Sequence, residues 1–173
     1  MLDTTVFKRL NERHLPDYPS ARKIVDAFES GRFCMASTFV VAKELHDERI
    51  PPNVRSVLLK EYYACQPRFI ETLKSREYDR AWKLAWNYIQ RLKKEDAKKH
   101  FDDALNYAWA SIGGCKSFVT VNRRGILTED YGSTLEGSNK KFRLPVVRIC
   151  DIENFCFTFL EKTSSQLQRK ERN

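Results

Sequence analysis

The stretch DDALNYAWASIGGCKSFVTVN, residues 102–122, decides the expected fold. Two aspartates open an apolar run with helical spacing, a Gly-Gly pair ends it, and a short apolar run follows. Acids at a helix start are stabilised by the helix dipole, and glycine commonly ends a helix. The pattern predicts a capped helix, a tight break and a buried strand that ends at Asn122.

Strands and helices are expected to alternate along the rest of the chain. Residues 1–7 predict a very short strand ending at Asp3, and residues 32–37 and 144–150 predict two more strands. This order favours an α/β fold with three α/β/α layers around a central, mostly parallel sheet. We expect a single domain over residues 1–163, followed by a polar tail over 164–173.

The helices expected between these strands have recognisable start and stop residues. One covers 19–30 and a second begins after the capping hydroxyl of Thr38. A long helical section follows over 54–99, divided at Pro67, and its tryptophans are interpreted as core rather than as a base-stacking platform. Residues 123–142 predict a long polar loop.

The composition describes a folded, positively charged protein. With 173 residues, 42% hydrophobic and 31% charged, the chain suits one domain and not a disordered segment. No apolar run approaches the roughly 18 residues that a membrane span needs, so we expect a cytoplasmic protein without a membrane partner. The formal net charge of +8 favours a polyanionic partner, nucleic acid first. The scattered cysteines and histidines lack metal-ligand spacing, which argues against a structural zinc site.

Acidic and amide side chains stand where the predicted strands and helices meet. Asp3 ends the first strand, Glu44 lies in the second helix, Asp103 begins the helix of 102–112, and Asn122 ends a strand. Strand ends and helix starts meet at one edge of a parallel sheet, and clustered carboxylates are ligands for Mg²⁺ or Mn²⁺. Singly, each residue also fits an ordinary cap, turn or surface position.

Four short segments in the right order resemble the motifs of PIN-domain nucleases, especially VapC-type toxins. LDTTVF resembles their LDTNV, TFVVAKEL their SxxTxxEL, DALNYAWA their DALIAATA, and FVTVN their LVTRN. The resemblance implies a PIN-like fold, a carboxylate-held Mg²⁺ or Mn²⁺, cleavage of RNA, and frequently a homodimer. Thr5 replaces the Asn of the first motif. The first strand has little room before Asp3, which predicts a less fixed edge of the site.

The resemblance also assigns roles to individual residues. Asp3, Glu44 and Asp103 are implied as the catalytic metal ligands, with Asn122 as a fourth, neutral catalytic member. Thr120 is expected to orient the site, and Arg123 and Arg124 are expected to contact the RNA backbone. Asp102 is left as a helix cap or as a residue that supports the metal ligands from behind. Further basic residues expected to hold the RNA near the strand ends are Lys140, Lys141 and Arg143.

These features together predict a metal-dependent endoribonuclease that hydrolyses phosphodiesters. The resemblance adds the role of the toxin in a type II toxin–antitoxin pair, with a small antitoxin protein as partner. A non-catalytic PIN-like protein that binds nucleic acid or supports an assembly is the alternative. Cleavage of DNA ranks third, because the sequence shows no double-strand-binding helical element.

Overall fold

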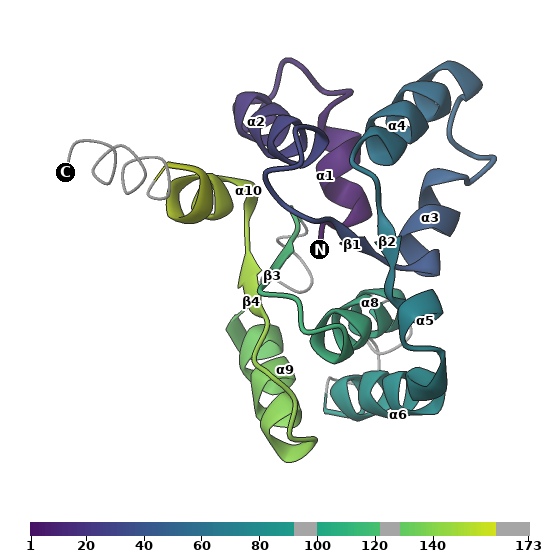
Figure 1. The fold of residues 1–173 in the computed structure, drawn as a ribbon, viewed down its shortest axis with the longest axis vertical. Coiled ribbons are helices and arrows are strands. Elements are labelled where there is room, and N and C mark those ends of the chain that lie inside the picture. The colour runs from purple at the N-terminus through teal and green to yellow at the C-terminus, as the bar shows by residue number, and fades with distance from the viewer. Residues whose placement is uncertain (92–99, 122–128, 162–173) are drawn as a thin grey trace.

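The computed structural model describes residues 1–91, 100–121 and 129–161, which are mostly helical (Figure 1). The strands are β1 (Ala36–Ser37), β2 (Arg68–Phe69), β3 (Ser117–Val119) and β4 (Arg148–Cys150). The helices are α1 (Thr4–Arg9), α2 (Tyr18–Glu29), α3 (Phe39–Leu45), α4 (Pro52–Ala64), α5 (Ile70–Leu73), α6 (Tyr78–Ile89), α8 (Phe101–Ile112), α9 (Glu129–Lys141) and α10 (Ile152–Phe155). A 3₁₀ turn, Ser75–Glu77, precedes α6, and a π-helical segment, Cys156–Glu161, follows α10.

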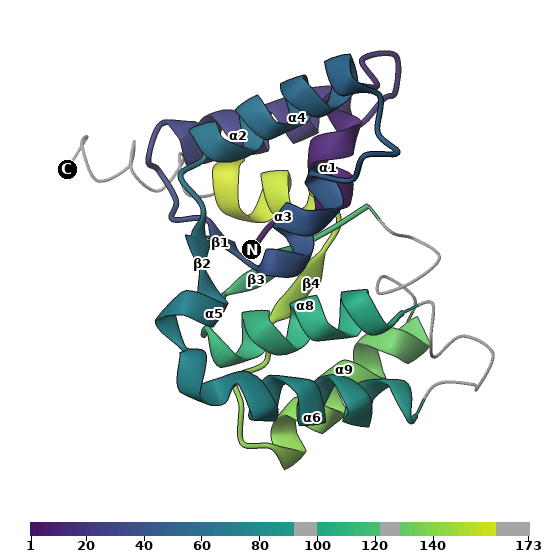
Figure 2. The same cartoon turned by 90° about the vertical axis from the view of Figure 1, so that its right-hand side faces the viewer.

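The strands are parallel, as expected, but the central sheet is much reduced. β1 pairs with β2, and β3 pairs with β4 with Phe118 opposite Ile149. Leu2 forms an isolated parallel bridge to Val119 on the other edge of β3. In the described ranges these strands form two separate two-stranded sheets, so the expected continuous central sheet is not observed. Figure 2 shows the strands between α1, α2 and α4 on one side and α6, α8 and α9 on the other.

The very short strand expected to end at Asp3 is reduced to an isolated parallel bridge at Leu2. Asp3 already caps α1 by accepting a hydrogen bond from the Thr4 amide. A side chain that satisfies a free amide at a helix start favours helix over further strand. Val6 and Phe7 are fully buried and form the inner face of this short helix.

Several predicted helices are confirmed. α2 falls within one residue of the expected range, and the Thr38 hydroxyl accepts from the Val41 amide at 3.2 Å to cap α3. α8 ends at Gly113, and Gly114 has φ +67°, a conformation that glycine adopts without steric cost. The helical section after residue 54 is divided near Pro67, where β2 separates α4 from α5. Its end, residues 92–99, lies outside the described residues.

The predicted polar loop over 123–142 was wrong for most of its length, because α9 occupies Glu129–Lys141. The sequence of this segment predicts a loop because the buried face of the helix includes two polar side chains, Ser138 and Asn139. Asn139 is nevertheless well bonded: it accepts from the Tyr88 hydroxyl and donates to Ser111 Oγ at 2.9 Å. A buried amide with satisfied hydrogen bonds can replace an apolar residue at a helix interface.

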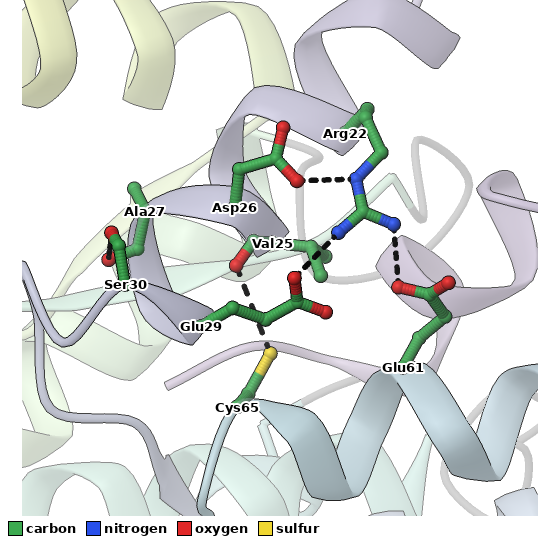
Figure 3. A network of polar contacts seen from close by, with 8 residues as sticks. All are labelled: Arg22, Val25, Asp26, Ala27, Glu29, Ser30, Glu61 and Cys65. Carbon is green, nitrogen blue, oxygen red and sulfur yellow. Dashed lines mark hydrogen bonds and ion pairs between the residues drawn. The ribbon is translucent and has the colours of Figure 1, made fainter.

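A charged cluster joins α2 to α4 (Figure 3). The Arg22 guanidinium contacts Asp26 at 2.6 Å, Glu29 at 3.0 Å and Glu61 at 2.5 Å. One planar cation therefore serves three carboxylates from two helices. Because Arg22 and Glu61 are mostly covered, this cluster fixes the packing of the two helices.

In the ranges that the structure covers, no helix combines the length and the apolar character needed to cross a lipid bilayer.

Candidate acidic site

Asp3 is held rigidly where the first backbone segment meets the end of β3. Its amide donates to the Val119 carbonyl at 2.9 Å, and its side chain is 3% exposed. Oδ1 accepts from the Thr4 amide at 2.9 Å, while Oδ2 accepts from the hydroxyls of Thr5 at 2.6 Å and Thr120 at 2.7 Å. A carboxylate offers about four acceptor positions, so one remains for a further ligand.

Thr5 and Thr120 together orient this carboxylate. Thr5 Oγ1 also accepts from the Val121 amide at 3.1 Å, and it therefore ties α1 to the chain leaving β3. Both hydroxyl protons point to Asp3 Oδ2, so the 3.2 Å approach of the two hydroxyl oxygens reflects their common acceptor. Thr5, the residue that departs from the motif, therefore takes part in holding Asp3 in place. The orienting position expected for Thr120 agrees with this geometry.

Glu44 lies half-buried in the last turn of α3, on the same side as Asp3. Burial raises the pKa of its carboxyl above the usual value, and the negative charges of Asp3 and Asp102 raise it further. The exposed Lys8 ammonium lowers it, as does the buried Thr4 hydroxyl, although Thr4 and Glu44 fall short of regular hydrogen-bond geometry. The site thus holds like charges close enough to disfavour full ionisation.

The two acids that open α8 have different surroundings. Asp102 is exposed, and its charge acts on Glu44. Asp103 lies beside His100, with 3.5 Å between its Oδ2 and the Nδ1 of the imidazole. The sequence assigned Asp103 to the metal and Asp102 to a cap or a supporting position, yet α8 shows no side-chain cap bond at its start. Asp102 is therefore an acidic member of the site that the motif alignment did not select.

A contact between Thr38 and Asn106 positions α3 against α8. Glu44 lies on α3, and Asp102 lies on α8. The Thr38 hydroxyl donates to Asn106 Oδ1 at 2.5 Å, and both side chains are buried. Glu71 accepts from the Phe39 amide at 2.8 Å at the same helix start. An asparagine inside the apolar run 102–112 was the sequence signal for this contact.

Other residues predicted for the site lie elsewhere or are not described. Asn122, Arg123 and Arg124 lie outside the described residues. The basic residues expected to hold RNA near the strand ends, Lys140, Lys141 and Arg143, lie at the far end of α9.

The position of that far end follows from contacts of α6. Arg80 donates to the Phe142 carbonyl at 3.0 Å, and Tyr78 packs on Trp109 with 5.7 Å between ring centroids. Since Trp109 is in the last turn of α8, the end of α9 lies beside the end of α8. At 1.5 Å per residue, the start and end of α8 are separated by roughly 15 Å. The placement predicted for this basic group was therefore wrong.

The acidic site suits a hard divalent cation without forming a complete cage for one. Among the described residues, no three His, Cys, Asp or Glu side chains lie together as a ready metal-binding group. Mg²⁺ needs only one or two carboxylates, because waters fill its remaining positions. The free acceptor position of Asp3 and the mutual repulsion at Glu44 are features that such a cation would use and relieve.

Comparisons with models of protein families, with curated proteins and with solved structures found no match to this chain.

Proposed function

We propose that this protein is a metal-dependent endoribonuclease with a PIN-like, three-layer α/β/α fold. The observation that carries the proposal is the buried Asp3 carboxylate, which is oriented by the Thr4 amide and the hydroxyls of Thr5 and Thr120. Asp3 lies beyond the carboxyl end of β3, where α/β folds bind their ligands. The negative charges of Asp3 and Asp102 also act on the carboxyl of Glu44 and raise its pKa, in addition to the larger effect of burial. The formal net charge of +8 supports a polyanionic substrate.

The strand arrangement supports the finer fold assignment. Leu2, β3 and β4 run parallel side by side, and β1 and β2 form a second parallel pair. Helices cover both faces of this strand layer (Figure 2). We interpret the two pairs as parts of one PIN-like sheet, shortened because helices begin directly after Asp3 and Thr38.

The described residues have distinct roles in the proposed reaction. Asp3, Glu44 and one or both acids of α8 would hold Mg²⁺ or Mn²⁺, and Asn122 is the proposed neutral member beside them. The bound cation would stabilise the negative charge that develops on the scissile phosphate. Thr5 and Thr120 keep the Asp3 carboxylate in one orientation, and Lys8 supplies a positive charge at the rim.

The wider biological role is carried by the motif resemblance. We propose RNA as substrate, backbone contacts from Arg123 and Arg124, a small antitoxin protein as inhibitor, and a homodimer in the cytoplasm. Binding of the purified protein to a co-expressed small partner, with loss of cleavage in the complex, would test the antitoxin assignment.

The nuclease assignment is tested with purified protein and labelled RNA in Mg²⁺ or Mn²⁺. Glu44→Gln, Asp3→Asn, Asp102→Asn and Asp103→Asn are compared with Glu48→Gln, a matched change at an exposed acid four residues beyond Glu44. We expect cleavage to be lost in Glu44→Gln and Asp3→Asn and kept in Glu48→Gln. Equal cleavage in all variants would refute the assignment.

A non-catalytic nucleic-acid-binding role is the second candidate. The lack of a ready group of three metal ligands in the described ranges favours it. Thermal unfolding with and without Mn²⁺ separates the two proposals, since a ligand that binds the native state at 100 times its Kd stabilises it by about 2.7 kcal/mol. No stabilisation at saturating Mn²⁺ would favour the non-catalytic role.

A further inference from the structure

A row of aromatic side chains is exposed along α6. Tyr78, Trp82 and Trp86 recur at every fourth residue and therefore share one face of the helix. Their side chains are 49%, 38% and 51% exposed. Large aromatic rings that stay in water on one helix face commonly mark a contact surface.

The row continues to the acidic site through Phe101. The ring centroids of Trp82 and Phe101 are 5.0 Å apart, and those of Trp86 and Phe101 are 5.6 Å apart. Phe101 directly precedes Asp102 in the first turn of α8. We name Tyr78, Trp82, Trp86 and Phe101 the aromatic row. Figure 2 shows α6 and α8 lying alongside each other, and Phe101 brings the row to the turn of α8 that carries Asp102.

The α6 rings of the aromatic row touch Trp109 and Phe101 on α8, yet they remain partly exposed. The helix buries a separate face against the core, formed by Ala81, Leu84, Ala85, Tyr88 and Ile89. The tryptophan that does fill the core is Trp109 on α8, which is 1% exposed. The interpretation of the tryptophans of α6 as core residues was therefore wrong for Trp82 and Trp86.

We propose that the aromatic row binds the bases of single-stranded nucleic acid and leads the strand to the acidic site. Every base has a flat face that stacks on an aromatic ring, whatever its identity. Rings four residues apart on a helix are separated by about 6 Å along its axis, more than the 3.4 Å spacing of stacked duplex bases. The row therefore fits separated bases of a single strand.

Charge and position favour nucleic acid over a protein partner. The net charge of the chain is +8, and the exposed Lys83 ammonium projects from the turn that carries Trp82. The row also ends one residue from Asp102, so a strand bound along it reaches the carboxylates. That the bound strand leads to the acidic site rests on the proposed nuclease function. The inference adds that the substrate is single-stranded.

Binding is measured in EDTA, which prevents cleavage, with a short labelled oligouridine and a hairpin duplex of the same length. Trp82→Leu and Trp86→Leu each remove a ring and keep an apolar side chain. We expect each to lower the affinity for oligouridine roughly 5- to 140-fold, the range that corresponds to 1–3 kcal/mol per stacked base. Trp86→Phe should keep most of the affinity, and the duplex should bind more weakly than the single strand.

Phe157→Leu serves as the matched control, because Phe157 is 57% exposed on a different segment. Unchanged affinity in the Trp82→Leu/Trp86→Leu double variant would overturn the proposal. Self-association that the double variant abolishes, with oligouridine affinity unchanged, would also overturn it and identify a contact between copies of the chain. Cleavage by Glu44→Gln is scored separately, so a failed nuclease assignment is distinguishable from a failed binding surface.

Discussion

The Arg22 cluster and the acidic site are two sets of three carboxylates with opposite electrostatics. Around Arg22, one guanidinium contacts Asp26, Glu29 and Glu61 (Figure 3). At the acidic site, the described residues show no ion pair to Asp3, Glu44 or Asp102, and the Asp3 carboxylate is bonded by an amide and two hydroxyls.

The presence of a paired cation in the Arg22 cluster and its absence among the described residues at the acidic site indicate different functions for the two sets of acids. A partly covered carboxylate cluster with its own arginine needs no further cation, and it links the two helices that carry it. The acidic site is bonded by neutral donors, and the pKa of Glu44 is raised first by burial and then by the charges of Asp3 and Asp102. Such a cluster is stabilised by a cation from solution, and this property is the physical basis for the proposed metal site.

The largest expected effect separates the two clusters by activity. Glu44→Gln should reduce RNA cleavage by about 100-fold, because losing a residue at or next to a metal costs this much or more. Glu61→Gln, the same change in the Arg22 cluster, should leave cleavage by the folded protein unchanged. Single-turnover cleavage at saturating Mn²⁺ measures both, and similar losses in both variants would contradict the division of roles.

For stability, we expect a clear loss when the Arg22 cluster is changed, whereas for cleavage we expect the loss at the acidic site. Arg22→Leu removes the shared cation, and we expect the free energy of unfolding to fall by about 1–2 kcal/mol, a figure kept small because these side chains are partly solvated. Mn²⁺ should stabilise the variant and the native protein by the same amount, since the cluster lies on α2 and α4 and not at the acidic site. Urea unfolding with and without Mn²⁺ is the measurement, and a difference between the two proteins that disappears in Mn²⁺ would contradict the comparison.

Thr5 tests the neutral donors of the acidic site. Thr5→Val keeps the shape of the side chain but removes its bond to Asp3 and the acceptor for the Val121 amide. We expect a loss of about 1 kcal/mol in stability and weaker Mn²⁺ binding. Thr5→Ser, which keeps the hydroxyl, should behave like the native protein in both assays.

The smallest effect concerns pH. The folded-state pKa of Glu44 is raised above the ordinary value of 4.5, so between the two pKa values the native state keeps a proton that the unfolded chain has released. Stability is therefore lost as pH rises from about 4.5 through the folded-state pKa. Without metal, Glu44→Gln should have the higher Tm at pH 7, and this advantage should shrink below pH 4.5. A Tm advantage of Glu44→Gln that grows as the pH falls would contradict the expected direction of this effect.

Local signals in the sequence predicted the parts of the fold that depend on neighbouring residues. The Thr38 cap, the Gly113 end of α8 and the strand after it follow from side chains within a few positions. α9 could not be predicted in this way, because Asn139 is accommodated by Tyr88 and Ser111, which are distant in sequence.

The same limit applies to the acidic site. Asp3 and Glu44 were predicted from motif order, and the structure couples them electrostatically. The choice between Asp102 and Asp103 depends on how the first turn of α8 faces α3, which the Thr38–Asn106 contact helps to fix. No spacing rule within residues 102–112 contains that information.

The hydrogen bond from Thr120 to Asp3 joins residues 117 positions apart, and this separation affects the time at which the site can form. Chains are synthesised at about 5–20 residues per second. Asp3 is therefore made roughly 6 to 23 s before the hydroxyl that orients it. A chain truncated before Thr120 lacks this bond, so a partly made or prematurely ended chain carries its first acid without the geometry that the complete site requires.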